Sequence, residues 1–283
     1  MNLQNIISEI EKSDPEIYEK LDTRRNAMKG FAKTSGKIAL ASIPFALGSM
    51  FQKAYSSPTA PTDLIIDTLN FALTLEYLES NFYIKAVASG IVPSGDALNA
   101  LTVIRDHENA HVNFLKTAIS AAGATPVSFT VASFDFTAKG TFPGVFTDYG
   151  TLLAVAQTFE DTGVRAYKGQ APNLISNNAY LTAALQIHSV EARHAAHLRE
   201  MRKEANLLLP SSADVKPWIT LNQSGIATSA VQASYDGEDT VVQGGVTITN
   251  IGGKSISTAA ASEAFDEPLT KEQVTSIVTP FFA

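Results

Sequence analysis

The chain has 283 residues, of which 45% are hydrophobic, so it can form one main domain with a sizeable core and further segments. Its net charge of −7 argues against nucleic acid as a partner, because phosphate-binding surfaces carry an excess of Lys and Arg. The chain contains no cysteine, which excludes disulfides, thiolate metal sites, iron–sulfur clusters and a cysteine nucleophile. Any metal site must therefore use Glu, Asp and His, which suit iron and manganese.

The first 57 residues have the order of an export signal, with a basic stretch, an apolar run and then small residues. The basic stretch resembles the twin-arginine consensus at Thr23, Arg24, Arg25 and Lys29. The apolar run, residues 38–51, is too short for a good membrane-spanning helix, which needs about 20 apolar residues. We expect residues 1–57 to be read by the twin-arginine export machinery and the mature protein to be periplasmic, without a stable membrane span. The alternative is a surface arginine pair followed by a buried core helix.

Four segments downstream of the signal have the length of bundle helices. Apolar residues recur in a broad helical stripe in the first segment, and glycine or proline ends all four. The predicted helices are 62–89, 96–122, 148–168 and 178–208. At 1.5 Å per residue, each spans roughly 30 to 40 Å, so the four helices can pack side by side over nearly their whole length.

The connections between these helices differ in length. Six residues join the first two helices and nine join the last two, which predicts two antiparallel hairpins. The second and third helices are joined by more than twenty residues, enough to travel the length of a bundle. In this connection, Phe129, Phe134 and Phe136 are expected to lie across the bundle surface.

The composition changes after the fourth helix. We assign residues 58–209 to the bundle and residues 210–283 to an appendage that packs on it. Alternating residues around Gly244 and Gly245 predict a small hairpin, and a Thr270 cap followed by apolar residues predicts a short terminal helix. Neither segment suggests chemistry.

A repeat links the first and third helices. In each, a glutamate follows a large apolar residue, and a tyrosine comes seven positions later on the same helical face. The two pairs are Glu76 with Tyr83 and Glu160 with Tyr167. These tyrosines either bond to ligand carboxylates, take part in electron transfer or serve as packing residues.

A second repeat links the other two helices, where Glu108 and His111 match Glu191 and His194. Residues three apart share a helical face, so each E-x-x-H motif directs a carboxylate and an imidazole to one point. A glutamate from each preceding helix, Glu76 or Glu160, would complete the set. Four carboxylates in a bundle core would repel one another and lose hydration, and two divalent cations would offset both costs.

Other polar residues near these motifs are weaker candidates. Glu79, one turn beyond Glu76, could replace or assist it, but the matching position in the third helix is Gly163. His107 and His197 are interpreted as surface or supporting residues, and His188, one turn before Glu191, as a hydrogen-bond partner of the site. Asp161 is expected to face solvent.

The order Glu, E-x-x-H, Glu, E-x-x-H resembles the ferritin-like superfamily of di-iron and di-manganese carboxylate proteins over residues 62–208. The resemblance implies an all-α, ferritin-like four-helix bundle with one long crossover, here with a small irregular or β C-terminal appendage and a short terminal helix. It also implies that Glu108 and Glu191 bridge two iron or manganese ions, that Glu76 and Glu160 are terminal ligands, and that His111 and His194 bind one ion each. The signal, the phrases LEYLESNFY and FEDTGVRAYKG and the tail are similar to the exported bacterial ferritin-like group, which includes desiccation-related proteins.

Such a site suits redox chemistry on Fe(II), oxygen or peroxide, by iron oxidation or by peroxide disproportionation. The competing interpretation is a non-enzymatic stress or envelope protein whose metal site is structural or lost. Iron storage in a shell is a third interpretation, which the appendage disfavours; a homo-oligomer stays open.

Overall fold

The protein is described from a computed structural model that covers residues 63–207 and 216–283. The predicted export signal, residues 1–57, lies outside the described residues, as does the predicted end of the fourth helix at Leu208. The described part is mostly helical. Within it, no helix combines the length and the apolar character that a membrane crossing requires.

Four long helices form a bundle at the predicted places: α4 (Asp63–Ala88), α5 (Asp96–Ala121), α6 (Tyr149–Gln170) and α7 (Asn178–Glu204). Side-chain caps define two of the starts, since Asp148 accepts a hydrogen bond from the Thr151 amide and Asn177 accepts bonds from the first amides of α7. The predicted helix 178–208 extended four residues beyond the observed end of α7 at Glu204. The helix ends at Glu204 because Asn206 adopts a left-handed conformation with φ 56°.

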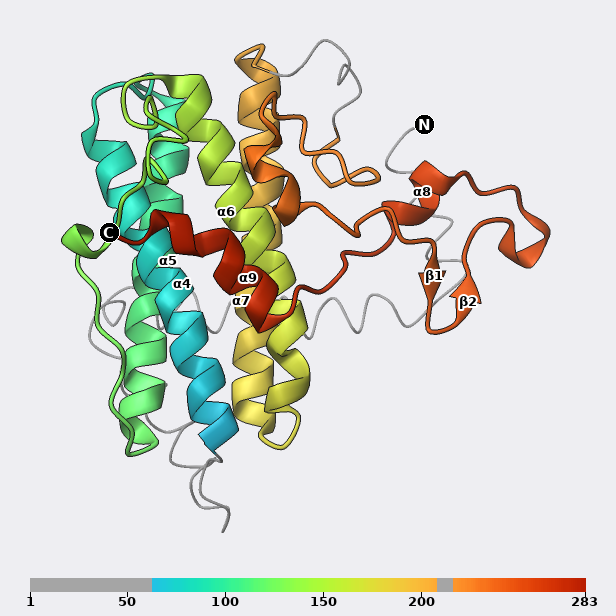
Figure 1. Ribbon diagram of the computed structural model, residues 1–283, viewed down its shortest axis with the longest axis horizontal. Helices are drawn as coiled ribbons and strands as arrows, with labels where there is room; N and C mark the ends of the chain where they lie inside the picture. Colours follow the sequence, from blue (N-terminus) through green and yellow to red (C-terminus); the bar gives the residue numbers. More distant parts are fainter. Residues whose placement is uncertain (1–62, 208–215) are drawn as a thin grey trace, which may run out of the picture. The chain divides into compact units, whose positions relative to one another are not determined.

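The connections are those of a bundle with one long crossover. Helices α4 and α5 pack as one hairpin, and α6 and α7 pack as a second. Figure 1 shows the segment between α5 and α6, in light green, returning along the length of the bundle before α6 begins. This segment lies on the bundle through its aromatic residues, since the ring of Phe136 packs against that of Phe82 on α4, with centroids 5.6 Å apart. Both Phe134 and Phe136 are buried, and Phe129 is half-buried.

The C-terminal segment contains the predicted hairpin and terminal helix. Strands β1 (Val242–Gln243) and β2 (Val246–Thr247) pair antiparallel, and both glycines between them have positive φ. Helix α9 (Lys271–Val278) begins at a capping box made by Thr270 and Gln273. The segment also contains α8 (Thr258–Ser262) and the 3-10 turns η4 (Ser229–Ser234), η5 (Ile251–Gly253) and η6 (Thr279–Phe281). Two further 3-10 turns of the described residues, η1 (Val131–Ser133) and η2 (Ala171–Leu174), lie in the connections between bundle helices.

This segment is held against the bundle by backbone contacts on α6. The Leu269 amide donates to the Arg165 carbonyl at 3.1 Å. The approach is so close at Gly169 that an added Cβ would lie 1.9 Å from the Leu269 oxygen, so only glycine fits there. The chain end is tied to the crossover in turn, because Phe282 forms a β-bridge with Phe134.

Candidate metal centre

The six residues of the two repeats meet in the bundle core, midway along the four helices. Each hairpin contributes one glutamate from its first helix and an E-x-x-H pair from its second, which the three-residue spacing holds on one helical face. The four glutamates are fully buried, and the His111 side chain is 12% exposed. The residues brought together are Glu76, Glu108, His111, Glu160, Glu191 and His194.

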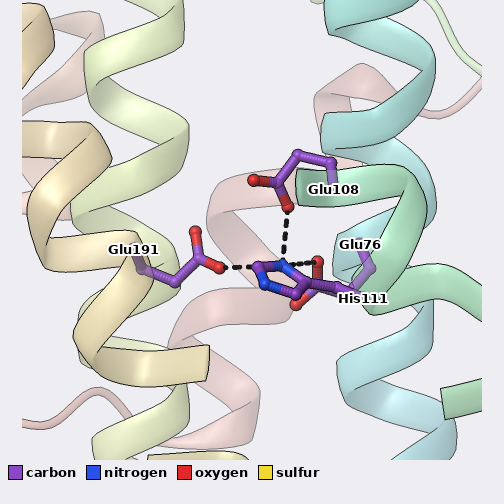
Figure 2. Close-up of side chains that lie close together, drawn as sticks. All are labelled: Glu76, Glu108, His111 and Glu191. Atoms are coloured by element: carbon purple, nitrogen blue, oxygen red, sulfur yellow. Dashed lines mark hydrogen bonds and ion pairs between the residues drawn. The ribbon is translucent and has the colours of Figure 1, made fainter. Parts of the chain in front are cut away.

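The first half of the cluster surrounds His111, as Figure 2 shows. Its Nδ1 lies 3.1 Å from Glu76 Oε2, 3.2 Å from Glu108 Oε2 and 3.3 Å from Glu191 Oε1. These four residues each offer a ligand atom, and the four atoms lie within 4.8 Å of one another. Three helices, α4, α5 and α7, therefore converge on one point that could hold a metal ion.

The second half surrounds His194. Its Nδ1 lies 3.0 Å from Glu108 Oε1, 3.1 Å from Glu160 Oε2 and 3.9 Å from Glu191 Oε2. This second group of four also brings its ligand atoms within 4.8 Å of one another. Glu108 and Glu191 belong to both groups and turn one oxygen toward each histidine, so the two points are adjacent and share two carboxylates.

Residues 65–204 match the family model of the ferritin-like domain. They belong to the ferritin-like superfamily. The matched range contains all six residues of the cluster and nearly all of the four bundle helices. No curated protein and no solved structure matches the chain.

Glu191, one of the two shared carboxylates of this ferritin-like domain, has unmet bonding capacity. Both of its oxygens are buried and accept no hydrogen bond from any residue in 63–207 or 216–283, whereas Oε1 of Glu108 lies 3.0 Å from His194 Nδ1. Buried acceptors are nearly always paired, because an unpaired one loses its hydration without compensation. Oxygen and imidazole donors around such acceptors fit divalent iron or manganese.

The pKa values of the cluster reflect burial opposed by ion pairing. Burial raises the pKa of Glu76 to about 7, although His111 opposes the shift. Burial would also raise the pKa of Glu108, but hydrogen bonds from His111 and His194 outweigh it and lower the pKa to about 2. Burial and the neighbouring charge of Glu108 raise the pKa of Glu191 well above its usual value.

The pKa values of both histidines of the cluster are raised. Burial alone would lower the pKa of His111, but the charges and hydrogen bonds of Glu76 and Glu108 together outweigh it and raise the pKa to about 11. At His194, the charges and hydrogen bonds of Glu160 and Glu108 together overcome burial and raise the pKa to about 10. Without metal, the cluster therefore holds protons that a bound cation would displace.

Two tyrosines support the cluster by crossing between hairpins. The Tyr83 hydroxyl on α4 donates to Glu160 Oε1 on α6, at 2.5 Å. The Tyr167 hydroxyl on α6 donates to Glu76 Oε1 on α4. Each tyrosine thus holds the glutamate of the opposite hairpin, which confirms the predicted bonding to these carboxylates. A part in electron transfer stays a prediction.

The other histidines have distinct places. His107 Nδ1 lies 2.9 Å from Nε2 of His194, the ring nitrogen that faces away from the carboxylates. Because His107 is exposed, it connects His194 with solvent. The expectation that His188 supports a ligand was wrong, since its Nδ1 contacts the Val164 carbonyl at 2.9 Å, one turn along α7 from the site. His197 is exposed.

Glu79 is a further buried carboxylate beside the cluster. Burial, followed by the charge of Glu160, raises its pKa well above the usual value. A Cβ added at Gly163 would lie 3.3 Å from Glu79 Oε1 and 3.5 Å from Glu191 Oε2. Gly163 is the residue of α6 that matches Glu79 in the repeat. Because glycine has no side chain, the Glu79 carboxylate occupies the space beside it.

The expectation that Asp161 faces solvent was wrong. Asp161 is buried and pairs with Arg199 of α7 at 2.5 Å, and the Tyr235 hydroxyl donates to the same carboxylate at 2.8 Å. A second buried pair joins Arg165 of α6 to Glu238 at 2.7 Å. Sequence patterns did not indicate these pairs, because their partners lie far apart in the chain and follow no repeat.

Proposed function

We propose that the ferritin-like domain binds two iron or manganese ions, with Glu108 and Glu191 bridging them. Glu76 and His111 would complete the ligands of one ion, and Glu160 and His194 those of the other. The observation that carries this proposal is the pair of overlapping ligand groups that share Glu108 and Glu191. Both groups are built from carboxylates and imidazoles, the donor set of dimetal helical bundles.

Charge balance supports two ions rather than one. Four carboxylates are buried together, and transfer of each unpaired charge from water costs several kcal/mol. Two divalent cations would neutralise all four, whereas one would leave an excess of buried negative charge. The buried oxygens of Glu191, which accept no hydrogen bond from a described residue, would then gain a partner on each side.

We further propose that the centre catalyses redox chemistry with oxygen or peroxide. When bound, two iron or manganese ions would supply one electron each, and incoming Fe(II), or a second peroxide that is oxidised to dioxygen with release of two protons, would return those two electrons. The reaction balances when oxygen takes two electrons and two protons to become peroxide, or when peroxide takes two electrons and two protons to become two waters. The buried helices exclude bulk water, and Tyr83 and Tyr167 hold the terminal carboxylates in place.

The chain also offers a route for protons. With Nδ1 of His194 as a metal ligand, Nε2 would carry the remaining proton and would donate a hydrogen bond to Nδ1 of the exposed His107. This contact orients the imidazole ring and links the buried centre to solvent. His111 lacks such a partner in its repeat, because the residue that precedes Glu191 is Val190.

For localisation, we propose export of the folded protein to the periplasm by the twin-arginine machinery. The support is the order of basic, apolar and small residues within 1–57. Fractionation of cells that express the full chain tests it: the wild type should be periplasmic, and the double variant Arg24→Lys and Arg25→Lys should stay in the cytoplasm.

A non-enzymatic envelope protein is the second candidate. One observation favours it: each histidine already forms ion pairs with three carboxylates, so the cluster can be stable with protons in place of metal. Purified protein loaded with iron or manganese should distinguish the two functions. Redox activity predicts Fe(II) oxidation or peroxide turnover that is lost in Glu191→Ala and retained in Glu204→Ala, an exposed control on the same helix. Metal-loaded protein without either activity would refute the enzymatic function.

A further inference from the structure

A small cavity lies in the bundle core on the η2 side of the metal centre. Side chains from all four bundle helices and from η2 line it, and its accessible volume is about 20 Å³. The surface that faces the cavity is almost entirely apolar and includes Leu75, Leu115, Ala184 and Ile187. Four lining residues carry a polar group, namely Thr68, Tyr167, Gln170 and Tyr180, and those of Tyr167 and Gln170 are bonded to Glu76 and Asn173. A cavity needs about 10 to 15 Å³ to hold one water-sized molecule, so this space admits a diatomic molecule and excludes an acyl chain or a drug-sized ligand.

The cavity adjoins the carboxylate cluster. Leu75 immediately precedes Glu76, Leu115 follows His111 by one helical turn, and Ile187 precedes Glu191 by one turn. Tyr167 connects the two spaces directly. Its side chain lines the cavity, and its hydroxyl donates to Glu76.

The polarity of the lining selects the occupant. An apolar cavity stays dry, because a water inside it finds too few of the two to four polar partners that it needs. Hydrogen peroxide, which donates and accepts hydrogen bonds, would be disfavoured for the same reason. Dioxygen makes no strong hydrogen bonds and is small enough to enter.

We propose that this cavity is a binding place for dioxygen, from which dioxygen reaches the metal centre on the Glu76 side. This inference rests on the proposed redox function and deepens it, because it makes dioxygen rather than peroxide the oxidant that this cavity admits. Peroxide then reaches the centre by another route and does not depend on the cavity.

The first experiment tests the cavity without metal. Dissolved dioxygen is paramagnetic and speeds the relaxation of NMR signals near the places where it resides. In the metal-free protein under oxygen pressure, the methyl signals of Leu75 and Ala184 should relax faster than that of Ala156, a fully buried alanine of α6 that does not line the cavity. Equal effects at the three residues would refute dioxygen binding in the cavity.

The second experiment uses a cavity-filling variant. Ala184→Val adds two methyl groups to the lining, and Thr182→Val places the same side chain at an exposed position of α7. We expect Ala184→Val to reduce the oxygen effect at Leu75 and to raise the KM for dioxygen several-fold, with unchanged metal content and unchanged oxidation by peroxide. Thr182→Val should behave as wild type.

The outcomes separate this inference from the proposed function. An unchanged KM for dioxygen in Ala184→Val, or an equal slowing of the oxygen and peroxide reactions, would refute the cavity as the route. Protein that binds two ions but reacts with neither oxidant would refute the redox function itself. In that case the relaxation of the Leu75 and Ala184 signals still decides whether the cavity takes dioxygen.

Discussion

The hydroxyl of Tyr83 donates a 2.5 Å hydrogen bond to Oε1 of Glu160, which lies on the other helical hairpin. Tyr167 makes the reciprocal bond to Glu76. Each hairpin therefore positions a carboxylate of the other, and the two halves of the centre depend on one another.

The first prediction concerns these two hydrogen bonds between the hairpins. Tyr83→Phe should weaken metal binding by about 10- to 100-fold, the usual effect of removing a group that orients a ligand. Tyr167→Phe should do the same, since it frees Glu76. Calorimetric titration with Mn(II) measures both, with Tyr77→Phe as the control because its ring packs on Phe129 away from the carboxylates. Wild-type affinity in both variants would show that the tyrosines serve only as packing residues.

The second prediction is the pH dependence of the metal-free protein. The pKa of Glu108 falls from 4.5 to about 2, so its contribution to stability grows as pH rises over that interval. The pKa of Glu76 rises from 4.5 to about 7 and that of His111 from 6.5 to about 11. Within these two pH intervals the folded state binds more protons than the unfolded state. Their contributions are lost as pH rises through about 7 and about 11.

The contribution of the cluster to stability should therefore be largest near pH 4.5, fall as pH rises toward 7 because Glu76 loses its proton, and fall further toward pH 10 because His111 loses its proton. Bound metal replaces these protons, so Mn(II) should stabilise the protein more at pH 8 than at pH 5. Urea unfolding at several pH values, with and without Mn(II), checks both statements. His111→Gln should reduce the alkaline loss in the metal-free protein, and an equal loss in that variant would contradict the assignment.

The third prediction concerns Gly163. The Cβ of an alanine there would press against the Glu79 carboxylate at 3.3 Å and would touch that of Glu191 at 3.5 Å, an ordinary contact distance. Because glycine within a helix costs roughly 0.5–1 kcal/mol relative to alanine, Gly163→Ala should stabilise the metal-free fold or leave it unchanged while it weakens metal binding. Gly150→Ala on the same helix is the control, since its Cβ would meet the Leu207 side chain. Unaltered metal affinity in Gly163→Ala would show that the carboxylates have room to move.

The fourth prediction concerns the buried pair between α6 and α7. Asp161→Asn should reduce the free energy of unfolding by about 3–5 kcal/mol, because it leaves the buried charge of Arg199 without its partner. The exposed pair of Arg105 and Asp106 is the comparison, where Asp106→Ala should cost only about 0–1 kcal/mol. Equal effects of the two substitutions in urea unfolding would contradict the role given to burial.

Much of the fold followed from local patterns. Helix lengths, the glycine or proline stops and the long connection predicted the bundle, because periodicity and helix termination act within a few residues. The repeat predicted the meeting of the six residues, since E-x-x-H places two side chains on one face whatever the rest of the chain does. It also indicated the tyrosines, although not that each bonds to the opposite hairpin.

What sequence reasoning missed depends on long-range packing. Asp161 looks like an exposed residue beside Glu160, and only the docking of Tyr235 and the position of Arg199 bury it. The contact of His107 with His194 joins residues 87 positions apart, and no pattern within either helix indicates it. The cavity beside Tyr167 arises from side chains of four helices and has no signal in any one of them.

The central claim is that the buried carboxylates hold two metal ions, and elemental analysis of purified protein tests it most directly. The wild type and the exposed control Glu204→Ala should each contain two equivalents of iron or manganese per chain. Glu108→Ala, which removes a ligand shared by both positions, should contain almost none. Wild-type protein without bound metal after loading, or a Glu108→Ala variant that retains two equivalents, would contradict the account.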